Sequence, residues 1–135
     1  MIRQGFPIGQ DDWYCEVLYD VRQNDLREVY YTLLDSGCPD YMAQKACMVL
    51  SSKNKGYTFT NLHTRHSVMF ISATTSAEQM YDSIQHETKH TVEHISDFFD
   101  VDPKSEESAY LQGEIARLMF PAAAIVICPV CRHKG

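Results

Sequence analysis

The chain has 135 residues, of which 44% are hydrophobic and 22% are charged, a composition typical of a single globular domain that excludes intrinsic disorder. Its formal net charge is −6 and no basic cluster occurs along the sequence, so we expect no nucleic-acid partner.

The beginning of the chain contains no apolar run of signal-peptide length. The most apolar stretch, residues 122–127, is far shorter than the roughly 20 residues that a membrane span requires. Five cysteines are spaced unevenly, which favours reduced thiols over a disulfide framework. These features predict a soluble, cytoplasmic protein without a membrane partner.

The last residues contain a Cys-Pro-Val-Cys motif formed by Cys128 and Cys131, followed by His133. This is half of the ligand set of a small zinc site. A solitary motif of this kind near a terminus is more often a pair of buried or exposed thiols, and that is the interpretation we favour.

The first half of the chain predicts one strand and two helices. Residues 13–21 alternate apolar and more polar side chains, which indicates a strand. Asn24 can cap a helix that ends near Ser36, where Gly37 offers a stop, and Pro39 can open a second helix. We expect that second helix to turn Met42, Ala46 and Val49 inward.

The second half predicts a hairpin followed by two helices. Residues 57–62 and 67–73 are rich in β-branched and aromatic side chains and form the hairpin. Thr75 and Ser76 precede Glu78 and Gln79 at capping-box spacing and open a helix that continues to about Phe99. Ser105 caps a last helix that extends toward Pro121. The fold class is therefore α+β, a single domain with a small antiparallel sheet packed on the long helix.

The long helix contains the sequence His86-Glu87-Thr88-Lys89-His90, an HExxH motif. Residues four apart lie one turn apart on the same helical face, so both imidazoles can reach one zinc ion while Glu87 handles a water. A motif with three fixed positions can also arise by chance. The prediction of a zinc site therefore needs independent evidence from the rest of the helix.

The phase of the apolar residues supplies that support. At about 100° per residue, the apolar positions fall on one side, and His86 and His90 point to the opposite side. We expect His94, one turn further along, to be exposed. The predicted core stripe comprises Ala77, Met80, Tyr81, Ile84, Thr88, Thr91, Val92, Ile95, Phe98 and Phe99. The alternative is a solvated polar face without a metal.

Catalytic zinc sites usually have three protein ligands and an open position, so a third ligand is expected. The next helix offers Glu106 and Glu107. Glu106 shares a face with Ala109, Gly113 and Ala116, whose small side chains allow a close helix contact, and it is the preferred ligand, with Glu107 as the alternative. Both carboxylates also interact favourably with the helix dipole.

The HETKH motif and the later Glu-Glu-Ser-Ala-Tyr sequence of residues 106–110 resemble the gluzincin metallopeptidases, in which an HExxH helix is followed by a helix carrying ExxA. With the preceding hairpin and the short chain, they look most like small zincin-like domains of the ImmA/IrrE type, common in phages and mobile elements. Tyr110 stands where that pattern has an acid or an amide.

The resemblance implies a zinc-dependent peptidase in which Zn²⁺ is held by His86, His90 and Glu106, and Glu87 removes a proton from the attacking water. Tyr110, His63 and His66 are candidate donors to the oxyanion. The strand at 67–73 is a candidate to pair with an extended peptide substrate.

Two other classes of function remain open. In the first, the fold and the zinc are present but turnover is negligible, and the chain is a metal-stabilised module that binds one protein partner. In the second, the motif is accidental and the chain is a small α+β interaction protein.

Overall fold

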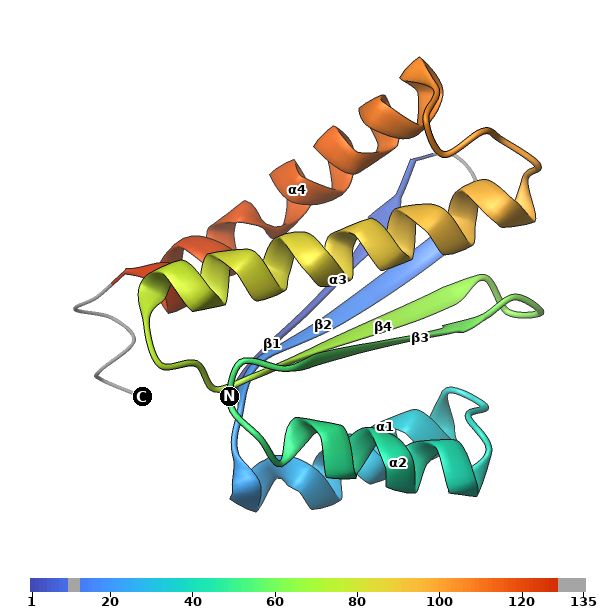
Figure 1. Ribbon diagram of the computed structural model, residues 1–135. Helices are drawn as coiled ribbons and strands as arrows, with labels where there is room; N and C mark the ends of the chain where they lie inside the picture. The colour runs from blue at the N-terminus through green and yellow to red at the C-terminus, as the bar shows by residue number, and fades with distance from the viewer. Residues whose placement is uncertain (10–12, 129–135) are drawn as a thin grey trace.

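A computed structural model describes residues 1–9 and 13–128 of the chain. A four-stranded sheet lies between two pairs of helices, which gives three layers (Figure 1). The α+β class is confirmed, and α3 and α4 lie on one face of the sheet while α1 and α2 lie on the other (Figure 1).

The sheet is mixed. It contains β1 (Ile2–Ile8), β2 (Trp13–Val21), β3 (Gly56–Asn61) and β4 (His66–Ser72) in the order β1-β2-β4-β3. β2 and β4 are parallel, and the β1/β2 and β3/β4 pairs are antiparallel. The expected antiparallel sheet is therefore wrong, because the helical crossover between β2 and the β3/β4 hairpin brings β4 back parallel to β2.

The first helical layer contains the two predicted helices, but the predicted cap at Asn24 is wrong, because Asn24 lies inside a 3₁₀ turn and Asp25 is the N-cap of the first helix. A 3₁₀ turn, η1 (Gln23–Asp25), leads into α1 (Leu26–Asp35), and α2 (Asp40–Leu50) follows. Gly37 has a φ of 92°, the left-handed conformation that favours glycine after a helix end. Pro39 is the N-cap of α2. Ala46 is buried as expected, whereas Met42 and Val49 are half-buried.

The second helical layer is an antiparallel pair formed by α3 (Ala77–Phe98) and α4 (Glu106–Ile127). Ser76 Oγ accepts a hydrogen bond of 3.1 Å from the backbone N–H of Gln79, which confirms the predicted cap. Ser105 caps α4 in the same way, through Ser108. α4 runs six residues past Pro121, so the predicted end of that helix is wrong.

Two apolar clusters flank the sheet, because alternate side chains of a strand point to opposite faces. Trp13, Cys15, Val17 and Tyr19 of β2 join the cluster beneath α3 and α4. Leu18 joins the cluster on the α1/α2 face. Burial raises the pKa of the Cys15 thiol well above its usual range, with a smaller contribution from the charge of Glu16.

The predicted core stripe of α3 is confirmed over its middle. Met80, Ile84, Thr88, Thr91, Val92 and Ile95 are buried. Tyr81 is 55% exposed, and Phe98 and Phe99 are more than one-third exposed while their rings contact Trp13. The stripe is therefore narrower at both ends than the periodicity predicts.

By length and mean hydropathy alone, α4 could cross a membrane, although only 28% of its most apolar window is buried in the protein. Its inner face packs on the sheet through buried Ile115, Met119 and Val126. Core helices pass the same test of length and composition, so this property is weak evidence for a span.

Candidate metal centre

The HExxH motif lies in the middle of α3, on the flank of that helix that faces the edge strand β3. His86 Nε2 and His90 Nε2 are 3.1 Å apart. Glu87 Oε2 is 4.0 Å from His86 Nε2. Potential ligand atoms of these three residues all lie within 4.8 Å of one another. The one-turn spacing therefore brings both imidazole nitrogens to a common point.

Glu87 is the buried member of this group. Its side chain is 4% exposed, against 66% for that of His86. Thr58 of β3 donates a hydrogen bond of 2.8 Å from its hydroxyl to Glu87 Oε1. A Cβ placed on Gly56 would lie 2.6 Å from Glu87 Cδ and 2.7 Å from Glu87 Cγ. The glycine thus makes room for the carboxylate, and Thr58 holds one of its oxygens.

His94 continues the row of histidines toward the end of α3, and its expected exposure is wrong: the residue is half-buried. Its Nδ1 lies 2.7 Å from Thr60 Oγ1, which is 2.8 Å from Ser67 Oγ. Trp13 donates to the same Ser67 hydroxyl at 3.0 Å. Burial lowers the pKa of His94, with a smaller contribution from His90. The edge strand therefore holds this ring in a defined orientation.

The donor set is compatible with zinc. Two imidazole nitrogens bound tetrahedrally at about 2.0–2.1 Å would be about 3.3 Å apart. The observed 3.1 Å is close to this separation. Among the described residues, the group contains one carboxylate, that of Glu87, so the same side chain is the available third ligand and the available base.

Glu106 and its neighbours do not face α3, and the expected close contact through Glu106, Ala109, Gly113 and Ala116 is wrong. All four residues are exposed. A Cβ on Gly113 would meet nothing within 4 Å. The contact uses other positions instead, because Ser96 pairs with Ser108 and Thr88 contacts Met119.

The position of α4 explains why Glu106 is not brought to the histidines. α4 packs beside α3 over β1 and β2, whereas Glu87 and His94 face β3 at the other edge of the sheet. Ser108 of α4 contacts Ser96 of α3. At 1.5 Å per residue, Ser96 lies about 9 Å further along α3 than His90. Glu107, the alternative ligand, is also exposed and lies on the same distant turn.

The three candidate oxyanion donors also lie away from the centre. Tyr110 is 74% exposed near the start of α4. His63 is exposed in the turn between β3 and β4. His66 is next to Glu16, with its Nε2 3.0 Å from Glu16 Oε1. Its side chain alternates with that of Ser67 and so points to the α1/α2 face, opposite α3.

The strand expected to pair with substrate is an inner strand. β4 is hydrogen-bonded to β2 on one side and to β3 on the other, which leaves no open edge for a peptide. β3 forms the edge of the sheet beside the centre. Of the C-terminal motif, Cys128 is half-buried at the C-cap of α4, and Cys131 and His133 lie outside the described residues.

Three residues of β3 that no sequence motif marks also shape the centre: Gly56, Thr58 and Thr60. Alternation along the strand gives a partial signal, since Gly56, Thr58 and Thr60 share one face and that face is free of large apolar side chains. Only the packing of α3 against β3 brings this face of the strand next to the HExxH motif.

Comparisons of the chain with family models, with curated proteins and with solved structures gave no match.

Proposed function

We propose that the chain is a zinc-dependent hydrolase that cleaves a peptide bond, with the metal held by His86 and His90. The observation that carries this proposal is the convergence of their two Nε2 atoms, 3.1 Å apart, beside the carboxylate of Glu87. The peptide substrate is inferred from the chemistry of the HExxH motif, which is typical of metalloproteases.

His86 and His90 would hold the zinc ion, which would supply a Lewis acid that makes a water easier to deprotonate. Glu87 is placed to accept the proton of that water at Oε2, since Oε1 is occupied by the hydroxyl of Thr58. The same carboxyl group can then return the proton to the leaving amine. The buried position of Glu87 keeps its carboxylate in one orientation for both transfers.

The edge strand β3 is the element that suits an extended peptide substrate. A peptide added to this edge would run beside Thr58, whose hydroxyl contacts Glu87. The backbone of β3 would supply main-chain hydrogen bonds to the peptide. β3 therefore takes the role that the sequence had suggested for β4.

A second candidate function is a metal-stabilised module that binds one protein partner without turnover. It is favoured by the composition of the metal group, in which Glu87 is the carboxylate available for both ligation and proton transfer. If Glu87 is the third ligand, it cannot serve as a free base, and cleavage would be slow.

Zinc binding by calorimetry and peptide cleavage on a mixed peptide library separate these candidates. The hydrolase predicts stoichiometric zinc, lost in the His86→Ala/His90→Ala variant, and a Glu87→Gln variant that keeps zinc but loses at least about 100-fold in cleavage rate. Glu106→Gln is the matched control, because that residue is exposed on the far side of α4 and should leave zinc affinity unchanged.

Each other outcome has a defined meaning. Zinc binding without cleavage supports the binding module, particularly if Glu87→Gln also weakens zinc affinity. Absence of zinc binding contradicts both candidates and leaves an interaction protein with a polar helix face. Loss of zinc binding in Glu106→Gln would show that Glu106 is a ligand and would contradict the packing of α4 described above.

A further inference from the structure

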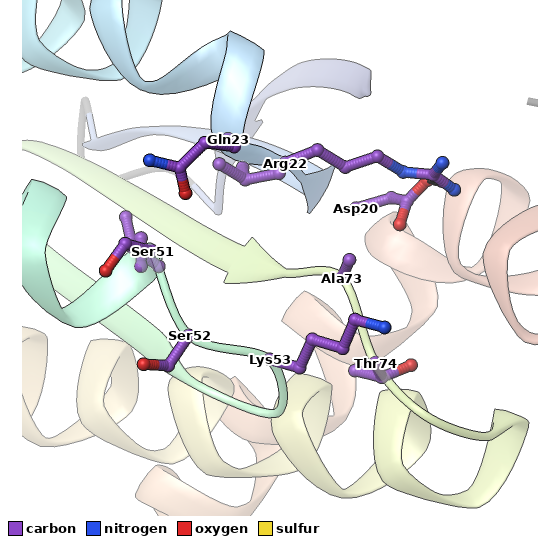
Figure 2. A pocket seen from close by; sticks show the side chains of 10 residues that line it. Asp20, Arg22, Gln23, Ser51, Ser52, Lys53, Ala73 and Thr74 are labelled. Carbon is purple, nitrogen blue, oxygen red and sulfur yellow. Dashed lines mark hydrogen bonds and ion pairs between the residues drawn. The ribbon is translucent and has the colours of Figure 1, made fainter.

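A pocket lies where the parallel strands β2 and β4 both end. It has a volume of about 360 Å³. Its walls come from the end of β2, the start of η1, the segment after α2 and the residues after β4 (Figure 2). Ligands of sheets with parallel strands commonly bind in crevices outside the carboxyl ends of those strands. The pocket therefore lies at a position where ligands commonly bind.

The pocket combines an apolar floor with a polar rim. Val21 and Leu50 are buried at its base, together with the hydroxyl-bearing Thr74. Arg22 and Lys53 are exposed at the rim and approach the hollow from opposite walls (Figure 2). Such a lining suits a small molecule with a short apolar part and a polar group that lies at the mouth.

The charge of the lining has the opposite sign to that of the whole chain. Arg22 and Lys53 face a single lining carboxylate, Asp20, so the pocket carries a formal charge of +1 on a protein of net charge −6. Asp20 Oδ2 is 3.0 Å from Arg22 Nη2 and neutralises that guanidinium in part. Lys53 forms no ion pair within the described part of the chain.

The backbone fixes both cationic walls. Asp20 and Asn54 have φ values of 59° and 62°, in the left-handed region that non-glycine residues seldom adopt. The β2/β4 register is also broken between Leu18 and Val21, directly before the pocket wall formed by the end of β2. On the other wall, Asn54 donates from its backbone N–H to Ala73 at 3.0 Å and accepts from Thr75 at 3.0 Å.

We propose that this pocket binds a small organic oxyanion, a carboxylate or a phosphate monoester with a short apolar chain. Lys53 and the outer nitrogens of Arg22 receive the anionic oxygens, and the apolar chain lies against Val21 and Leu50. The site is separate from the HExxH centre and does not require the function proposed for it.

Nuclear magnetic resonance of the ¹⁵N-labelled full chain tests this proposal, with propyl phosphate, butyrate and inorganic phosphate titrated to about 10 mM, a range that detects dissociation constants near 1 mM. Potassium chloride at equal ionic strength is the control for screening. We expect saturable shifts at the amides of residues 20–23 and 51–54, absent with chloride, for at least one of the organic anions.

Lys53→Gln should weaken that binding by about tenfold, because it removes one charge-assisted hydrogen bond. Lys45→Gln, at an exposed position of α2 outside the pocket, should leave it unchanged. Saturation by propyl phosphate alone or by butyrate alone identifies the class of anion. The proposal is overturned if no anion gives saturable shifts at these residues, or if Lys53→Gln binds as tightly as the unmodified chain.

Discussion

Gly56 shows how the lack of one side chain shapes the candidate metal centre. The residue lies on the edge strand directly against Glu87, and an added Cβ would overlap three atoms of that buried side chain. Thr58, two residues further along β3, holds the same carboxylate through its hydroxyl. The orientation of Glu87 therefore depends as much on β3 as on its own helix.

Gly56→Ala should lower the free energy of unfolding by about 1–3 kcal/mol, the usual cost of overpacking, because Glu87 must leave its place. The matched control is Gly113→Ala on the open side of α4. It should raise stability by about 0.5–1 kcal/mol through helix propensity. Urea denaturation of both variants measures the difference, and equal effects would contradict the close approach.

At the scale of elements, α3 has to start at the correct residue for the HExxH face to meet β3. The Ser76 cap fixes that start, and the helix then runs for 22 residues with its apolar stripe on the sheet. Since each residue turns the helix by about 100°, a rotation of α3 by one position would direct Glu87 and His94 away from β3.

Ser76→Ala removes the acceptor of the Gln79 amide and should cost about 1 kcal/mol of stability. Lys45→Ala in the exposed part of α2 is a suitable comparison, since lysine and alanine have similar helix propensities and no cap is lost there. Thermal unfolding followed by circular dichroism provides the measurement. A change in Ser76→Ala no larger than that in the comparison variant would show that the cap contributes little.

At the scale of the whole molecule, one sheet joins two apolar clusters that share no helix. The chain contains a single tryptophan, Trp13, which is 1% exposed beneath α3 and α4. Leu33 is fully buried on the opposite face, in the α1 layer. Since β2 and β4 contribute to both clusters, neither layer can lose its packing without affecting the other.

Leu33→Ala should therefore destabilise both faces together, by about 2–5 kcal/mol. Its urea transition followed by Trp13 fluorescence should coincide with that followed by far-ultraviolet circular dichroism, as in a two-state domain. If the fluorescence transition stays at the position of the unmodified chain while the circular dichroism transition moves, the two layers unfold independently.

Local signals in the sequence were sufficient for most elements and for the geometry within one helix. The cap at Ser76, the stop at Gly37 and the core stripe in the middle of α3 are confirmed, since each depends on residues a few positions apart. The convergence of His86 and His90 has the same local origin. β1 was not predicted, because a segment with Gly5 and Pro7 has little strand preference of its own and forms by pairing with β2.

Only the tertiary structure determined what stands beside the HExxH helix. The sequence placed Glu106 against α3, yet the helices meet through Ser96, Ser108, Thr88 and Met119, and the face with the smallest side chains points outward. Gly56 and Thr58 reach Glu87 instead, from a strand about 30 residues away in the sequence. Helical periodicity determines which side chains share a face, but which neighbour covers that face follows from the packing of the entire core.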